Sequence, residues 1–90
     1  MPNPIVEYVL TPHAEYEMKR REIPEVILRQ TLKSPDQRIP GRGRDVLQSR
    51  FEIDGKRYLV RVFVDVDRQP PEVVTVYRTS KIDKYWRIER

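Results

Sequence analysis

The sequence has no cysteine and only one histidine, His13, among its 90 residues. The absence of cysteine excludes a disulfide framework, a thiolate metal site and a cysteine nucleophile. A zinc site with one histidine would need carboxylates as its other ligands, which is an uncommon set. We therefore expect no metal and no cofactor, and the lack of cysteine fits a protein of the reducing cytoplasm.

Long apolar runs and familiar catalytic motifs are also missing. Residues 5–10 are apolar, but Glu7 interrupts them, and no stretch approaches the roughly 20 apolar residues that span a bilayer. There is no phosphate-binding glycine loop and no nucleophile elbow. We expect no membrane association, and any chemistry must come from side chains that the fold gathers.

Charge is abundant and unbalanced. Lysine and arginine number 18 against 14 acidic residues, a formal net charge of +4, while 38% of the residues are hydrophobic. The hydrophobic residues recur at regular spacing, so residues 1–90 are expected to fold as one domain. A basic domain attracts polyanions through phosphate neutralisation, which favours nucleic acid as a partner. Alternatively, the positive net charge serves only to keep the protein soluble, as in many small basic proteins.

The first third of the chain predicts two helices. Thr11 can cap a helix over residues 12–21, and Pro12 suits its first turn. Pro24 cannot continue that helix comfortably but can open a second one, over residues 24–33. The expected buried residues of the two helices are Ala14, Met18, Ile27, Leu28, Thr31 and Leu32.

Alternating sequence in the second half predicts a sheet. Residues 45–53 and 56–67 read as strands, and Asp54-Gly55 between them is typical of a two-residue hairpin turn. Residues 72–78 form a third strand, and the stretch from Thr79 or Ser80 to Trp86 resembles a short helix. Residues 5–10 are either a short strand or an extended lead-in. We therefore predict an α+β fold, in which two N-terminal helices pack on one face of an antiparallel sheet of three to four strands and a short C-terminal helix follows.

The two-residue turn fixes the register of the hairpin and sorts its side chains between two faces. Gln48 should lie opposite Arg61, and Phe51 opposite Tyr58. The face expected against the helices carries Leu47, Ser49, Phe51, Tyr58, Val60, Val62 and Val64. The other face carries Gln48, Arg50, Glu52, Arg57, Leu59, Arg61 and Phe63.

That second face mixes arginines with apolar and aromatic residues. Arginines can hold phosphates while exposed rings stack on bases, so the face is a candidate RNA-binding surface. It also fits an ordinary solvated sheet face with a weak Glu52–Arg57 ion pair. Arg42 and Arg44, in a basic loop before the hairpin, are further RNA-binding candidates, with Arg50 and Lys84.

Two other places could supply catalytic groups. Lys81, Lys84 and Tyr85 stand at helical spacing near the C-terminus, so one helix face can present them together. In the alternative, purely structural interpretation, Ile82 and Trp86 dock that helix on the core. His13 is the usual type of general acid or base near neutral pH, although a single helical histidine often has only a structural role.

Several short segments resemble one known family. These are His13-Ala14, then Arg21-Glu22-Ile23, then the charged hairpin and Val74-Thr75-Val76-Tyr77. From Tyr8 to Trp86 the chain is similar to the DUF4258 family of prokaryotic domains, which resembles the RelE/BrnT-like toxins. Glu17 and Glu22 stand where that family usually has an arginine and a glycine.

The resemblance implies a toxin of a toxin–antitoxin pair that interferes with translation by cleaving RNA without a metal, with the ribosome as one place where it could act, and that binds an acidic antitoxin. In such cleavage the ribose 2′-hydroxyl attacks the adjacent phosphate, which requires a base, an acid and stabilisation of negative charge. The candidates are His13, Arg50, Arg61, Arg78, Lys81 and Tyr85. Arg61 and Arg78 are expected to stabilise the phosphate, although simple alternation groups Arg78 with Val74 and Val76, so that a bulge would have to redirect it. The rival hypothesis is a non-catalytic module whose basic face binds nucleic acid or an acidic protein.

Overall fold

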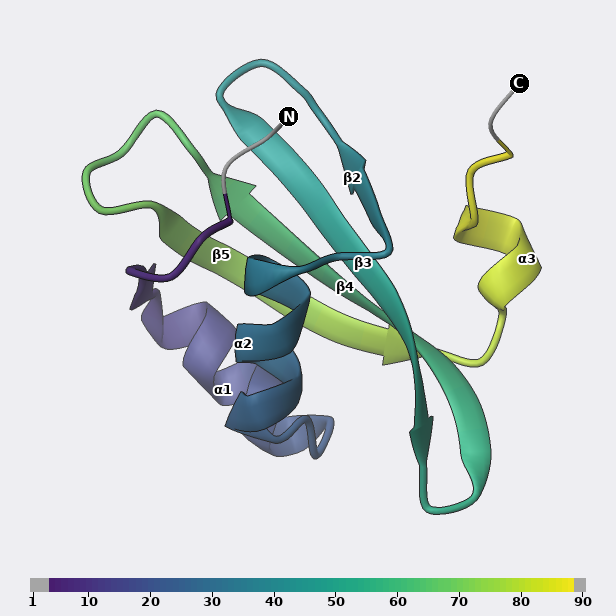
Figure 1. Ribbon diagram of the computed structural model, residues 1–90. Helices are drawn as coiled ribbons and strands as arrows, with labels where there is room; N and C mark the ends of the chain where they lie inside the picture. The colour runs from purple at the N-terminus through teal and green to yellow at the C-terminus, as the bar shows by residue number, and fades with distance from the viewer. Residues whose placement is uncertain (1–3, 89–90) are drawn as a thin grey trace.

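The computed structural model describes residues 4–88 and shows an α+β fold (Figure 1). The elements, in chain order, are β1 (Val9–Leu10), α1 (Pro12–Arg20), α2 (Glu25–Lys33), β2 (Gln37–Ile39), β3 (Arg44–Ile53), β4 (Lys56–Asp65), β5 (Glu72–Thr79) and α3 (Ile82–Tyr85). The strand order is β1-β5-β4-β3-β2, with β1 parallel to β5 and the other pairs antiparallel. The expected antiparallel sheet of three to four strands was therefore wrong in detail, since the sheet is mixed and has five strands.

Helix α1 begins and ends with recognisable capping. The Thr11 hydroxyl accepts a hydrogen bond from the backbone N–H of Ala14 at 3.0 Å, as expected of an N-cap. At the other end, the N–H of Ile23 donates to the carbonyl of Met18 at 2.9 Å and that of Glu22 to Lys19 at 3.2 Å. Glu22 has a φ of 53°. This is a Schellman motif, with Glu22 in the left-handed position where glycine is preferred.

Helices α1 and α2 cover one face of the sheet (Figure 1). The hairpin register is the expected one, with Gln48 opposite Arg61 and Phe51 opposite Tyr58. The core between helices and sheet is formed by Ile5, Ala14, Met18, Ile23, Leu28, Leu32, Leu47, Val60, Val62, Val64, Val73 and Val76. The expected core face of the hairpin is thereby confirmed.

The opposite face is not the open surface that the sequence suggested. Gln48 and Leu59 are fully buried there, with 0% of their surface exposed. The C-terminal segment covers Gln48, because Gln48 donates to the carbonyl of Tyr85 at 3.1 Å and the neighbouring Gln37 accepts from the N–H of Arg87 at 3.0 Å. Helix α3 and residues 86–88 therefore form a third, partial layer.

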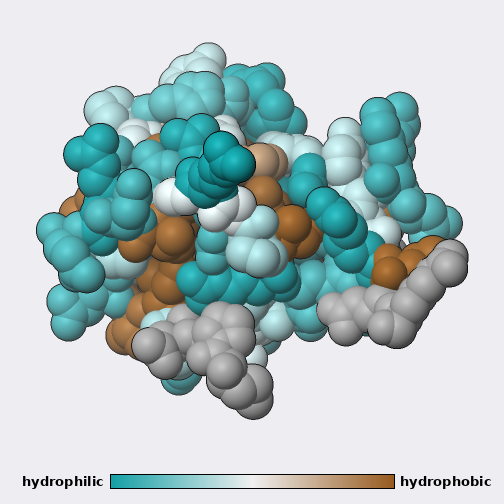
Figure 2. Space-filling view, turned by 90° about the horizontal axis from the view of Figure 1, so that it is seen from above, coloured by the Kyte–Doolittle hydropathy of each residue, from teal (hydrophilic) through white to brown (hydrophobic). Residues whose placement is uncertain are grey.

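The end of the molecule that carries the β2–β3 and β4–β5 loops is mainly polar, with apolar residues showing in separate patches (Figure 2). Two ion pairs lie at this end. Arg38 bonds to Asp45 at 2.9 Å, and Arg44 to Asp65 at 2.6 Å. No helix of the described chain is long and apolar enough to cross a membrane.

Candidate functional site

Arg61 lies at the centre of an aromatic box on the sheet face opposite α1 and α2. Its guanidinium carbon is 4.5 Å from the ring centroid of Tyr85, 5.3 Å from that of Phe63 and 5.8 Å from that of Tyr77. The rings come from α3, β4 and β5, so three separate elements position one cation. Contacts of this kind attract a cation to the ring faces and hold the guanidinium in place.

The hydrogen bonds of Arg61 all go to neutral groups. Its Nε donates to Gln48 Oε1 at 2.9 Å, and its Nη1 donates to the hydroxyl of Tyr77 at 2.7 Å. Among residues 4–88 no carboxylate forms an ion pair with Arg61, and no acceptor takes a hydrogen bond from its Nη2. The positive charge of this half-buried group is therefore not neutralised by the described protein, which leaves it suited to an anionic ligand.

The buried amide of Gln48 connects Arg61 to the C-terminal segment. Its Nε2 donates to Gln37 Oε1 at 2.8 Å and to the carbonyl of Tyr85 at 3.1 Å. Gln37 in turn holds the backbone of Arg87, as an accepting and a donating partner. A continuous polar chain thus runs from Tyr77 through Arg61 and two glutamines to the tail.

Of the other predicted site residues, Tyr85 supplies one ring of the box and Lys84 lies beside it. The ring of Tyr85 has Arg61 at 4.5 Å and the ammonium of Lys84 at 5.4 Å from its centroid. Arg50 stacks on the ring of Trp86 at 4.1 Å, also on the tail side of the sheet. Lys81 is exposed just before α3. The structure therefore brings Arg61, Tyr85 and Lys84 together, with Arg50 on the same face.

Arg78 is not part of this group, which corrects the expected pairing with Arg61. It lies opposite Val60 in the β4–β5 pair, while Arg61 lies opposite Tyr77. The two arginines therefore point to opposite faces of the sheet, and Arg78 stacks on Tyr58 at 4.6 Å on the helix side. The irregularity in the pairing lies opposite Phe63 and Val64, which in β5 is N-terminal to Tyr77 and Arg78. It therefore leaves Arg78 on the same side of the sheet as Val76 instead of redirecting it.

The remaining candidates also lie elsewhere. His13 is exposed in the first turn of α1, in the helical layer, and no contact joins it to the Arg61 box. Arg42 and Arg44 are at the far end of the sheet. The hydrogen bond to Asp65 raises the pKa of Arg44 and lowers that of the Asp65 carboxyl. Arg44 is thus paired with Asp65, away from the Arg61 box.

The Arg61 box also contains residues that had no assigned role in the sequence. Tyr77 and Gln48 both bond directly to the guanidinium, and Phe63 stacks on Tyr77 with ring centroids 6.0 Å apart. Gln48 and Phe63 were already expected on this face. The position of Tyr77 on this face could be predicted only from the register of the third strand, and no tight turn fixes that register.

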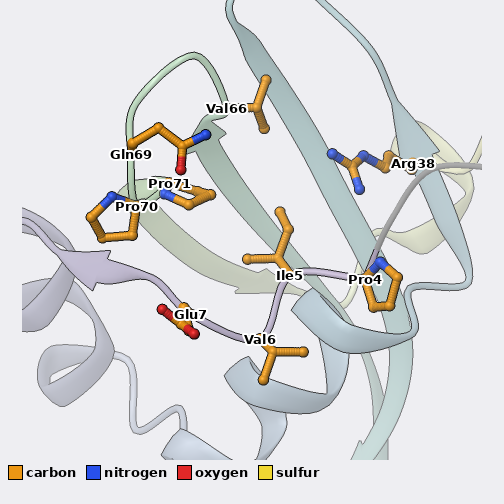
Figure 3. A pocket seen from close by; sticks show the side chains of 9 residues that line it. All are labelled: Pro4, Ile5, Val6, Glu7, Arg38, Val66, Gln69, Pro70 and Pro71. Atoms are coloured by element: carbon orange, nitrogen blue, oxygen red, sulfur yellow. The ribbon is translucent and has the colours of Figure 1, made fainter.

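A hollow beside the N-terminal segment contains none of the proposed catalytic residues. It measures about 510 Å³ and lies between the N-terminal segment and the β4–β5 loop, with Arg38 at one side (Figure 3). Its lining is mostly proline and aliphatic residues, with Glu7 the one carboxylate. Nowhere in residues 4–88 do three or more His, Cys, Asp or Glu side chains gather as a metal site would require.

Comparison of the chain with protein-family models, with curated proteins and with solved structures finds no match in any of the three.

Proposed function

We propose that this protein is a RelE-like, RNA-directed toxin of the cytoplasm, which cleaves RNA without a metal and is held in check by an acidic antitoxin. One observation carries the proposal. Arg61 is a fixed, half-buried cation with no carboxylate partner among the described residues, and aromatic rings surround it. A charged fork beside aromatic rings matches a phosphate next to an unstacked base.

The proposed reaction is an attack of the ribose 2′-oxygen on the adjacent phosphorus. The new oxygen–phosphorus bond forms as the bond to the 5′-oxygen breaks, a base takes the 2′-hydroxyl proton, and an acid protonates the 5′-oxygen. Arg61 stabilises the negative charge that develops on the phosphoryl oxygens. Because His13 lies in the other layer, the proton transfers are assigned to groups near the box. The hydroxyl of Tyr77 or Tyr85 takes the 2′-hydroxyl proton as it passes its own proton to water, and the ammonium of Lys84 protonates the 5′-oxygen.

Expression without a partner protein tests this function. The wild type is expected to arrest growth, and the purified protein to cleave RNA in the presence of EDTA. Loss of one preorganised charge donor typically costs about 100- to 1,000-fold in rate, so Arg61→Ala should relieve both effects. Arg29→Ala, which removes an exposed arginine from α2, is the matched control and should behave as the wild type.

The alternative is a non-catalytic module whose basic face binds an acidic segment of another protein. The observation in its favour is that Arg50 and Lys84, beside the box, are exposed. A harmless wild type that is inactive on RNA and on ribosomes, yet binds an acidic peptide through Arg61, would favour the module over the toxin. Co-purification with an acidic protein does not discriminate, because a toxin has such a partner too.

A further inference from the structure

A second group of cations lies on the helix side of the sheet, around Arg78. It lines a hollow of about 430 Å³. The residues that line this hollow are Arg20, Arg21, Glu22, Lys56, Tyr58, Arg78, Thr79 and Ser80. They come from the C-terminal end of α1, from the start of β4 and from the end of β5. Four of the eight are cationic and one is acidic, so the lining has a clear excess of positive charge.

The pairing of these cations leaves much of that charge available. Arg20 and Arg21 share a single carboxylate, Glu17, each with a nitrogen 3.0 Å from its Oε2. Lys56 and Arg78 form no ion pair within residues 4–88, and both approach the ring of Tyr58, at 5.7 and 4.6 Å from its centroid. Arg78 is thus held by an aromatic ring and not by an acid, which is also how Arg61 is held.

The hollow and the Arg61 box are neighbours around one edge of the sheet. Strand β1 pairs only with Glu72 and Val73, so residues 75–79 of β5 have β4 on one side and, in the described part of the chain, no strand on the other. Arg21 lines the hollow and also places its guanidinium carbon 5.7 Å from the ring centroid of Tyr77. The hydroxyl of Tyr77 accepts from Arg61. A path lined with cations therefore leads from one face to the other.

We propose that the Arg78 hollow is a second phosphate-binding site, which holds the backbone of a single-stranded RNA that passes over the β5 edge from the Arg61 box. The inference rests on the proposed function and adds a substrate class to it. A duplex has a persistence length of about 150 base pairs and cannot turn around one strand edge, whereas a single strand can. Phosphate oxygens accept hydrogen bonds from guanidinium, ammonium and hydroxyl groups.

Binding of two oligonucleotides of different length tests this path. The probes are fluorescein-labelled 2′-O-methyl oligouridylates of three and twelve nucleotides, which lack the attacking hydroxyl, and fluorescence anisotropy gives the affinities. Arg78→Gln should weaken binding of the longer probe several-fold and lower its salt slope by about 0.7, the contribution of one phosphate on a single strand. It should leave the short probe unchanged, because that probe fits the Arg61 box alone.

Two variants make the result interpretable. Arg61→Gln should weaken both probes, whereas Arg29→Gln, which removes a charge from the exposed face of α2, should weaken neither. Circular dichroism must show that each variant keeps the fold. If Arg78→Gln changes neither probe, or weakens both equally, the separate site is refuted while RNA binding stands. If the wild type binds neither probe, the proposed function fails first. Equally tight, Arg78-dependent binding of oligoglutamate would identify the hollow as a peptide site.

Discussion

Replacing Gln48 by methionine should release the C-terminal segment and destabilise the protein. Gln48 is fully buried and makes three hydrogen bonds, to Arg61, to Gln37 and to the carbonyl of Tyr85. Methionine keeps nearly the same length and volume, so the substitution removes the hydrogen bonds without opening a large cavity.

The magnitude follows from the partners that lose their bonds. A neutral hydrogen bond contributes about 1 kcal/mol and one to a charged group about 1.5–3 kcal/mol. Water can rehydrate the half-buried Arg61 and the freed carbonyl of Tyr85, which reduces the loss. We expect the free energy of unfolding to fall by about 3 kcal/mol, with part of that loss appearing as local release of the tail.

Urea denaturation measures the loss of stability, and the single tryptophan reports on the tail. Trp86 stacks on Arg50 at 4.1 Å, so its fluorescence should shift to the red when the segment leaves the sheet. Gln30→Met on the exposed side of α2 is the matched control and should change stability by less than about 0.5 kcal/mol. We call the hydrogen bonds of Gln48 to Gln37 and to the carbonyl of Tyr85 the clasp, because they are expected to hold the C-terminal segment on the sheet. A Gln48→Met variant within about 0.5 kcal/mol of the wild type, with unshifted Trp86 emission, would refute this role of the clasp.

Two further predictions concern stability. Glu22 occupies the left-handed C-terminal position of α1 with a φ of 53°, so Glu22→Gly should stabilise the protein by up to about 1 kcal/mol in thermal unfolding. A loss of stability would show that the glutamate side chain outweighs the strain. The hydrogen bond from Arg44 lowers the pKa of Asp65, so the folded state binds fewer protons at this site than the unfolded state. The stability that the ionised Asp65 carboxylate adds to the folded state is fully present above its ordinary pKa of 3.8. That contribution is lost as pH falls through the lowered pKa of the folded state. Asp65→Asn should therefore show a smaller fall in melting temperature below about pH 4 than the wild type; an equal fall would contradict the role of the pair.

The hairpin was predictable because local chemistry determines it. Asp54 and Gly55 have φ values of 52° and 77°, as a type I′ turn requires, and this turn set every pair from Gln48 opposite Arg61 to the tip. Strand β2 was missed, and β1 was left open between a strand and an extended lead-in, because two or three residues are too few to show alternation.

The site was only partly predictable because its assembly depends on contacts between distant residues. The placement of Arg61 followed from the register, but its cover by the tail depends on Gln37 and Arg87, which are 50 residues apart. The side of the sheet on which Arg78 lies depends on the pairing of β4 with β5, and the loop between them contains no two-residue turn that would fix it. The sequence therefore predicts which cations lie on the same face of one strand more readily than it predicts which of them meet in one site.

Arg61 has two roles in this arrangement, and they must be separated before its loss can be interpreted. The guanidinium that is proposed to hold a phosphate also bonds to Gln48, which fixes the tail. Arg61→Ala therefore removes a charge and weakens the clasp together. Gln48→Met weakens the clasp but keeps the charge. If RNA cleavage depends on the cation itself, Gln48→Met must retain far more activity than Arg61→Ala at equal loss of stability. Equal inactivation would mean that the placement of Tyr85 by the tail, and not the charge of Arg61, limits the reaction.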